Sequence, residues 1–463
     1  MASRQFKELF AIPLRNGLTK PKAVRGAGTK MVNMGELFAN PRIVDVAMDR
    51  VPLNQAERSS SLLAAGDLLF ARQSLVLSGA GKCSIFVGDD EDVCFESHVI
   101  RCRLNQELAD PYFYYYFFSS PVGRTLIESI VEQGAGASGI RGSDLAELSV
   151  PWIAPTVQRR IAGVLSQIDD KIAVNRRINQ TLEAMAQAIF KSWFVDFDPV
   201  KAKIAAKQEG RDPLRAAMGA ISGKTEAEID ALPPEQYEQL AATAALFPDE
   251  MEASELGDIP RGWACCVLAD ICSFTAGSAF KPEHQGSTEG EFPFIKVSDM
   301  NLAGNEVFIQ SANNYVSKAQ QSEMKAKLHP SGATVFAKIG VALISNRRRL
   351  LTSPTIVDNN LMSASPVEDK SGQYFLYSLL STLDFNTLVS GTALPYINVS
   401  DLKKISIVLP PYDACLSFEA KASSIFSMMQ TLAAQSSTLA ATRDALLPKL
   451  LSGEIEASGT FEG

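Results

Sequence analysis

The stretch Gly66-Asp67-Leu68-Leu69-Phe70-Ala71-Arg72 returns later in the chain as Gly332-Ala333-Thr334-Val335-Phe336-Ala337-Lys338. Two further pairs of similar stretches occur in the same order and at a similar separation. These pairs are residues 32–37 with 295–300, and Ser143-Asp144-Leu145 with Ser400-Asp401-Leu402. A period of this length is far too long for a solenoid, so the matches predict one domain that is present in two copies.

Each copy ends in a segment whose seam residues recur in alternating steps of four and three, the spacing of a heptad seam between packed helices. Pro151 and Pro155 precede the first segment and Pro410-Pro411 the second, and proline suits a helix start because its missing N–H is not needed there. We expect Gly453 to cap the second helix. The seam residues include Leu165, Ile168, Ile172, Asn175, Asn179 and Leu182 in the first helix, and Ile425, Leu432, Leu439 and Leu446, which are every second seam position, in the second.

Two of the seam residues, Asn175 and Asn179, are polar. A buried asparagine in a coiled coil often fixes the register of the helices at a cost in stability. The alternative is that this face of the helix is exposed at both positions.

Ahead of each long helix, short apolar runs alternate with glycine-containing turns. Residues 68–70, 83–87 and 97–100 are predicted to be strands, and 112–118 a buried helix whose counterpart is 374–383. The fold predicted is therefore α+β, with two pseudo-repeated globular domains separated by two long antiparallel coiled-coil-like helices. The expected segments are a globular domain at 1–150, a long helix at 151–198, an acidic connector with short helices at 199–258, a second globular domain at 259–410, a second long helix at 411–453 and a tail at 454–463.

The composition is that of a protein with sizeable hydrophobic cores. The chain has 463 residues, of which 46% are hydrophobic and 21% charged, and its net charge is −8. Residues 201–258 hold twelve Asp and Glu against six Lys and Arg, which leaves about −2 for the rest of the chain. Because binding follows local potential, basic surfaces for nucleic acid remain possible elsewhere.

Several features indicate a cytoplasmic protein without membrane contact or a metal site. The seven cysteines form no CxxC pair, and the three histidines lie far apart in sequence. No apolar run approaches the length of a membrane-spanning helix.

A search for catalytic motifs is negative. Residues 219–225 resemble a phosphate-binding loop but are one residue short between the glycines. Leu409-Pro410-Pro411-Tyr412 resembles the Asn/Asp-Pro-Pro-Tyr loop of amino-methyltransferases, but leucine cannot accept a hydrogen bond from the target amine. We therefore expect no catalytic, cofactor-binding or metal-binding residues in this chain.

Polar and basic residues in loops of the two copies are candidates for DNA contacts. Arginine reads guanine and binds phosphate, asparagine and glutamine read adenine, and lysine binds phosphate. For residues 347–349 the alternative is a solvated turn, and for residues 391–398 an ordinary turn between a loop and a strand. The candidates are Lys30, Asn33, Arg72, Gln73, Ser74, Lys82 and Arg141 in the first copy, and Lys296, Lys338, Asn346, Arg347, Arg348, Arg349, Thr392 and Tyr396 in the second.

Over essentially its whole length the chain resembles the specificity (S) subunit of Type I restriction–modification systems. The resemblance rests on the two-copy layout and on motifs at the ends of the copies. These motifs are Lys191-Ser192-Trp193-Phe194-Val195-Asp196-Phe197-Asp198-Pro199, Leu246-Phe247-Pro248-Asp249, Leu256-Gly257-Asp258-Ile259-Pro260-Arg261-Gly262-Trp263 and Leu447-Pro448-Lys449-Leu450-Leu451-Ser452-Gly453.

The resemblance implies that each globular copy is a target recognition domain for one half of a bipartite DNA sequence, and that the helices set the distance between the halves. It implies double-stranded DNA, two modification (M) subunits with S-adenosylmethionine, and two restriction (R) subunits with ATP and Mg as partners. The M subunits would methylate adenine N6, and the R subunits would cleave. The alternatives are a self-contained DNA methyltransferase or nuclease, and a coiled-coil scaffold that does not bind DNA.

The matched loops of the two copies differ in sequence. Arg72-Gln73-Ser74 corresponds to Lys338-Ile339-Gly340. We therefore expect two different half-sites and a non-palindromic target.

Overall fold

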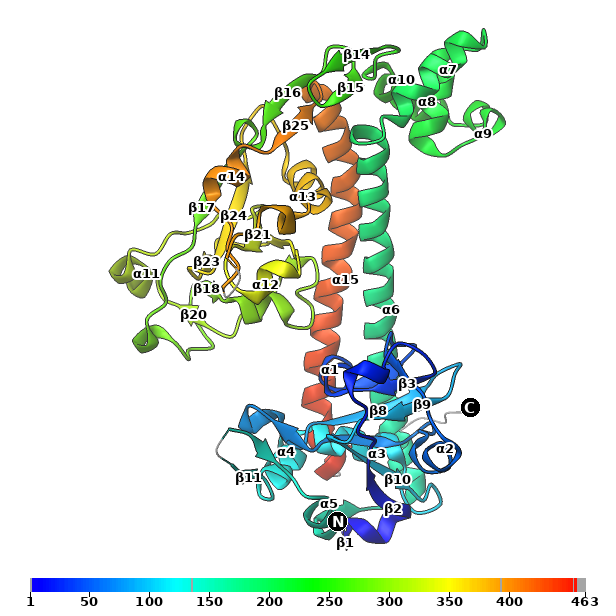
Figure 1. Cartoon of the computed structure of the whole chain (residues 1–463), viewed down its shortest axis with the longest axis vertical. Helices are drawn as coiled ribbons and strands as arrows, with labels where there is room; N and C mark the ends of the chain where they lie inside the picture. The colour runs from blue at the N-terminus through cyan, green and yellow to red at the C-terminus, as the bar shows by residue number, and fades with distance from the viewer. Residues whose placement is uncertain (1, 135, 392–393, 453, 456–463) are drawn as a thin grey trace. The chain divides into compact units, whose positions relative to one another are not determined.

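The structure is a computed structural model that describes residues 2–134, 136–391, 394–452 and 454–455. It divides into two compact units, one made of residues 1–173 and 438–463 and the other of residues 174–437. Each unit contains one β-rich domain and part of each of two long helices, α6 (Pro155–Phe194) and α15 (Tyr412–Ser452) (Figure 1). The expected mixed α+β fold with two β-rich domains joined by two long helices is confirmed.

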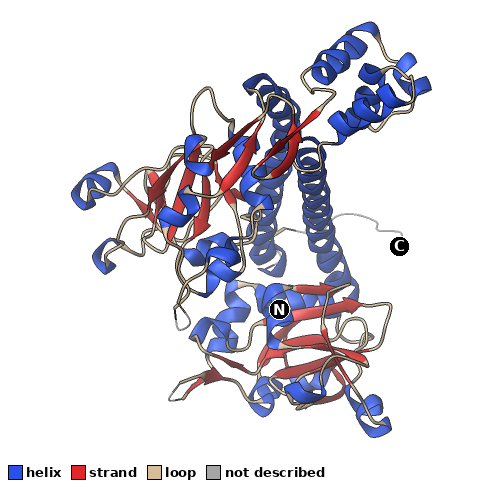
Figure 2. Ribbon diagram, turned by 45° about the horizontal axis from the view of Figure 1, so that its top comes forward, coloured by secondary structure: helices blue, strands red, loops and turns tan. Residues whose placement is uncertain are grey.

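The first β-rich domain is built on a five-stranded sheet, with strands drawn red in Figure 2. Its strand order is β2 (Phe10–Asn16), β10 (Val99–Leu104), β6 (Leu68–Ala71), β8 (Cys83–Gly88) and β4 (Arg42–Val44). Smaller sheets join β5 (Asp49–Val51), β3 (Thr29–Val32) and β9 (Val93–Phe95), β1 (Ala2–Gln5) and β13 (Ser149–Trp152), and β11 (Glu132–Gln133), β12 (Ser138–Gly139) and β7 (Gln73–Ser74). Its shorter helices are α1 (Met34–Ala39), α2 (Gln55–Ser61), α3 (Pro111–Ser119), α4 (Pro121–Glu128) and α5 (Gly142–Glu147).

The second β-rich domain repeats this topology. Its five-stranded sheet has the order β17 (Cys272–Ala276), β24 (Leu361–Pro366), β21 (Thr334–Ala337), β22 (Arg349–Leu351) and β19 (Phe308–Ile309). Smaller sheets join β20 (Tyr315–Val316), β18 (Phe292–Ile295) and β23 (Ile356–Val357), and β16 (Ala264–Val267) and β25 (Ser406–Leu409). Its helices are α11 (Lys318–Met324), α12 (Val341–Ile344), α13 (Gln373–Thr382) and α14 (Val399–Lys403).

The repeated stretch, at residues 66–72 and 332–338, forms the middle of both sheets. β6 and β21 are the third strands of their sheets, and every residue in both is buried. A strand buried on both faces requires a continuous apolar run, which Leu-Leu-Phe-Ala and Thr-Val-Phe-Ala largely supply. The internal duplication is therefore confirmed by the strand order.

The second matched pair, residues 32–37 and 295–300, makes the same backbone-to-side-chain hydrogen bond in both copies. The backbone N–H of Asn33 donates to the Glu36 carboxylate at 2.8 Å, and the backbone N–H of Lys296 donates to Asp299 at 2.6 Å. Each contact closes a capping box at the start of a short helical turn, which satisfies an otherwise unpaired backbone donor.

The predicted aromatic helix is present as α3, and its counterpart as α13. Asp110 caps α3 by accepting from the backbone N–H of Phe113 at 2.9 Å, and Pro111 occupies the first turn. The strand predicted at 97–100 begins later, at Val99, because the Val99 N–H donates to the Glu96 carbonyl and closes a turn over the preceding residues.

The region between the two copies is largely helical. It contains α7 (Asp198–Gln208), α8 (Pro213–Ser222), α9 (Glu226–Asp230) and α10 (Pro234–Ala245), followed by the hairpin β14 (Met251–Ser254) and β15 (Gly257–Pro260). Many of its apolar residues are buried despite the acidic composition, so these helices pack on a core. The buried residues include Val200, Ala217, Met218, Ile221, Ile229 and Ala244.

The two long helices pack together within each unit. In the first unit Leu165 shares a buried cluster with Leu447 and Leu450. In the second, Asn175 is fully buried and donates its side-chain amide to Gln435 Oε1 at 2.8 Å, and Asn179 donates to the Met429 carbonyl at 3.1 Å. Higher numbers on α6 meet lower numbers on α15, so the helices are antiparallel there. Ile172 is also buried, and Ile168, Asn179, Leu182, Ile425, Leu432, Leu439 and Leu446 are half-buried.

Two interpretations were open for the polar seam positions, a buried asparagine and an exposed helix face. At Asn175 the side chain is buried, so the face is not exposed there. The expected cap at Gly453 and residues 456–463 of the expected tail lie outside the described residues.

Candidate nucleic-acid interface

The small sheet β11–β12–β7 brings four of the candidate residues of the first copy together. Gln73 pairs with Gly139 and Ser74 with Ser138. The backbone N–H of Ile140 donates to the Arg72 carbonyl at 3.0 Å, which brings the next residue, Arg141, close to Arg72 along the backbone. A salt bridge of 2.7 Å to Glu132, a residue of β11, holds the exposed side chain of Arg141.

The second copy has the same arrangement with different side chains. Tyr396 forms isolated bridges with Ile339 and Ser390, in place of the three short strands. The Ile397 N–H donates to the Lys338 carbonyl at 3.0 Å, as Ile140 does to Arg72. Lys338 and Tyr396 are therefore brought together, and Asn398 occupies the position of Arg141. Thr392 lies outside the described residues.

Arg72 and Lys338 are the basic residues at matched ends of β6 and β21. Within the part of the chain that the structure describes, neither side chain has a hydrogen bond or an ion pair. The exposed Arg347 is likewise without a side-chain partner among the described residues. Such cations are available to bind phosphate or a base edge.

Three other candidates of the first copy are held by contacts inside their own domain. The Lys30 amine donates to Asp89 at 2.8 Å, and this hydrogen bond raises the pKa of Lys30. The Lys82 amine donates to the Phe38 carbonyl at 2.9 Å, and burial lowers the pKa of Lys82. The Asn33 side chain accepts from Arg25 at 3.0 Å. We therefore assign structural roles to these three side chains.

The three consecutive arginines of the second copy differ in environment. Arg348 is only 5% exposed, lies 3.8 Å from the ring centroid of Phe385, and donates to Asn346 Oδ1 at 2.9 Å. Burial lowers the pKa of Arg348 to about 10. Arg349 is half-buried and donates to the Met300 carbonyl at 3.3 Å, and burial lowers its pKa as well.

These contacts argue against the expected DNA contacts of Arg348 and Asn346, because both side chains are used to pack the domain. Of the three arginines, only Arg347 is exposed. Lys296 is half-buried, with its amine on Gln285 Oε1 and 5.1 Å from the ring centroid of Phe280.

Sequence reasoning missed an apolar component of the same surface. Leu75, immediately after β7, is 89% exposed, and Val341 in the second copy is 78% exposed. An apolar run such as 75–77 is typical of a core strand, so its composition alone gives no sign of exposure. The signal that could have found it is its position, directly after the matched residues 72–74.

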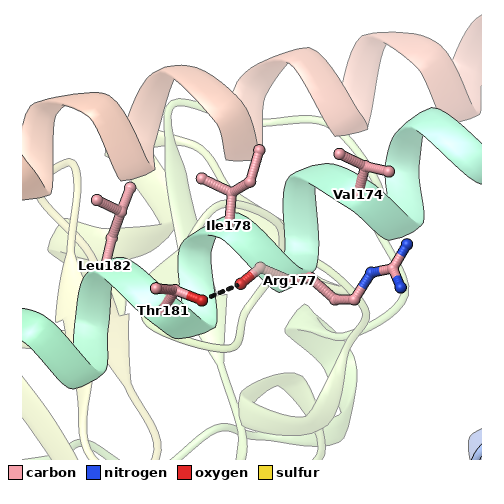
Figure 3. Close-up of a pocket in the computed structure, with 5 residues that line it drawn as sticks. All are labelled: Val174, Arg177, Ile178, Thr181 and Leu182. Carbon is pink, nitrogen blue, oxygen red and sulfur yellow. Dashed lines mark hydrogen bonds between the residues drawn. The ribbon is translucent and has the colours of Figure 1, made fainter.

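A groove follows α6 in the second unit, lined by Val174, Arg177, Ile178, Thr181 and Leu182. Figure 3 shows Ile178 and Leu182 pointing toward the neighbouring helix, and Arg177 pointing away from it. The Thr181 hydroxyl donates to the Arg177 carbonyl at 3.1 Å. Val174 is 37% exposed and Met185, further along the same helix, 49%. This part of α6 therefore presents an apolar face that is incompletely covered.

Within the described ranges, the structure holds no group of three or more His, Cys, Asp or Glu side chains placed to bind a metal ion. Among the helices described, none is both long and apolar enough to span a membrane.

Comparison with known proteins places these features in a family. The family model described as "Type I restriction modification DNA specificity domain" matches residues 1–184 and 260–446. The chain is 31% identical over 407 residues to the Type I restriction enzyme HindI specificity subunit of Haemophilus influenzae, covering 84% of this chain and 86% of that protein. It is 27% identical over 348 residues to the MjaIX specificity subunit of Methanocaldococcus jannaschii, covering 74% and 68%.

Among solved structures, the S subunit of a Type I restriction-modification system from M. genitalium is similar, with a TM-score of 0.46, 14% identity, and coverage of 97% of this chain and 95% of that one. The family match covers both β-rich domains and most of both long helices. The alternatives of a self-contained methyltransferase or nuclease and of a scaffold without DNA recognition are therefore excluded. The chain belongs to the Type I restriction-modification DNA specificity subunits, the non-catalytic subunits that determine which DNA target is recognised.

Proposed function

We propose that each β-rich domain is a target recognition domain that reads one half of a bipartite, asymmetric DNA sequence. The observation that carries this proposal is the duplicated surface at the ends of β6 and β21. Arg72, Gln73, Ser74 and Arg141 occupy it in the first copy, and Lys338, Ile339, Gly340 and Tyr396 in the second. Matched positions that carry different side chains are what two different half-sites require.

The two long helices set the number of unread base pairs between the halves. Two readers on one face of a duplex lie about 34 Å apart, or a multiple of that distance. A helix of 40 residues such as α6 extends about 60 Å, which is long enough to provide this spacing. Buried seam residues such as Asn175 and Leu165 keep the pair of helices in one register.

Two M subunits bind along the helices and carry S-adenosylmethionine. Val174, Ile178, Thr181 and Met185 recur in steps of four and three on α6, which is the pattern of a face that receives another helix. The M subunits methylate adenine N6, and flipping makes that atom accessible because it is unreachable inside the base stack. Two R subunits add ATP- and Mg-dependent cleavage, and the assembly acts in the cytoplasm.

Hydroxyl-radical footprinting of this chain together with its M partner tests the proposal. We expect two protected tracts with different sequences, separated by a spacer whose bases carry no sequence preference. One continuous tract, or two identical tracts, would contradict it.

A further inference from the structure

Leu75 and Val341 occupy the same position in the two copies. Each follows the matched basic residue, Arg72 or Lys338, by three positions. They are also the two most exposed large hydrophobic side chains among the described residues, at 89% and 78%. Scattered exposed apolar residues are ordinary, but the two extremes of one protein at one duplicated position require an explanation.

In the first copy the exposed side chain sits on an anchored loop. The Arg124 guanidinium donates to the Ser78 carbonyl at 3.0 Å, and the Gly81 N–H donates to the Ala71 carbonyl at 2.8 Å. A Cβ on Gly79 would lie 2.2 Å from Ser74 Oγ, so any larger residue would have to displace the Ser74 side chain. The loop therefore holds Leu75, and next to it Val76 at 61% exposure, away from the core.

In the second copy the exposed side chain lies on a short helix, α12, instead of a loop. The buried Leu343 anchors α12, and the Asn386 side chain donates to the Ile344 carbonyl at 3.3 Å. The Gly340 N–H donates to the Pro395 carbonyl at 2.7 Å, which fixes the start of the helix. Val341 is thereby held outward, directly after the strand end that carries Lys338.

We propose that Leu75 and Val341 are specificity-determining residues that contact base edges in the major groove and read the methyl group of thymine. The inference rests on the proposed function and deepens it. Thymine presents the apolar C5 methyl group in that groove, where apolar side chains can contact it. The adjacent Arg72 and Lys338, which have no partner in the described part of the chain, bind the phosphates beside it.

The difference between the two loops favours DNA over an M subunit as the occupant. Two identical M subunits would meet similar surfaces on the two copies. Here the first copy offers Leu75 and Val76 on a loop, and the second Val341 and Ile344 on a helix. Different half-sites account for that difference. Each half-site holds at least one thymine, because the adenine to be methylated is paired with one.

The test replaces each thymine of the mapped target in turn with deoxyuridine, which removes only the methyl group. Binding of the complex of this chain with M is then measured for wild type, Leu75→Ser and Val341→Ser. For wild type we expect one thymine in each half-site whose replacement weakens binding roughly fourfold, the effect of burying one methyl group. Leu75→Ser should abolish that sensitivity in one half-site only, and Val341→Ser in the other.

Val122→Ser is the matched control, because Val122 is 61% exposed on α4 in the first copy. It should bind like wild type. The inference is overturned if wild type is indifferent to every replacement, or if Leu75→Ser retains the full sensitivity. Loss of M co-purification in Leu75→Ser would also overturn it and assign the loop to M. If the wild-type complex methylates no split target, the proposed function itself fails, and the inference with it.

Discussion

Arg443 on α15 donates to the Asp169 carboxylate on α6 at 2.6 Å, and the same carboxylate accepts the Tyr116 hydroxyl of α3 at 2.7 Å. Asp169 is only 8% exposed. A buried carboxylate is costly unless it is paired, and here the pairing joins both long helices to the first β-rich domain.

Arg443→Met should destabilise the first unit, because it leaves the Asp169 carboxylate buried without its cation. We expect a loss of about 3 kcal/mol in the free energy of unfolding of that unit, measured by chemical denaturation. The double variant Arg443→Met with Asp169→Asn should lose less than the sum of the two single changes. Arg160→Met, at an exposed position of α6, is the control and should change stability little. Strictly additive losses would contradict the coupling.

Asn175→Leu should separate helix stability from helix register. The buried amide contacts Gln435, while its Oδ1 has no partner in the described structure, so leucine should not lower the thermal midpoint. Loss of the polar contact should permit alternative registers, because a buried asparagine specifies register in coiled coils. Mapping the methylated bases should then reveal targets with more than one spacer length. A single unchanged spacer would show that Asn175 does not set the register.

Lengthening both helices should change the spacer and nothing else. One heptad inserted at the level of Asn179 in α6 and of Met429 in α15 keeps the seam in phase and adds about 10 Å. That length corresponds to about three base pairs, at roughly 3.4 Å each. Sequencing of the methylated bases should return the same two half-sites with a longer spacer. Altered half-sites would refute the role of the helices as a spacer.

Substitutions on the uncovered face of α6 should weaken binding of M. Val174→Glu with Met185→Glu places carboxylates at two exposed apolar positions, where a docked helix would bury them without partners. We expect M affinity to fall by about tenfold or more, measured by calorimetry, with the thermal midpoint unchanged. Gln180→Glu adds charge to the same exposed helix away from this face and should bind M normally. Equal affinity for all three proteins would rule out this docking face.

Local patterns in the sequence were sufficient for the large-scale organisation. The repeated stretch around Leu68 and Val335 is a continuous apolar run, and a strand buried on both faces needs one. The heptad steps determine the long helices in the same way, because a seam of this period is buried only between helices.

The candidate interface could be predicted less well from the sequence, because tertiary packing decides which of its side chains are exposed. Arg348 stands in a basic run that is typical of a surface, but it packs on Phe336 and Phe385, which are distant in sequence. The strands that gather Gln73 and Arg141 are two residues long, too short for a periodic signal. Leu75 is an apolar residue of the kind usually found in a core, and its exposure is seen only in the folded structure.

A map of modified bases decides whether two unlike domains read two unlike half-sites. The chain is expressed with its M subunit in a host without DNA methylation, and the DNA is sequenced by a method that detects N6-methyladenine. We predict one split, non-palindromic motif, methylated on opposite strands in its two halves. A palindromic motif, or no new methylation from a soluble complex of the two proteins, would contradict the account.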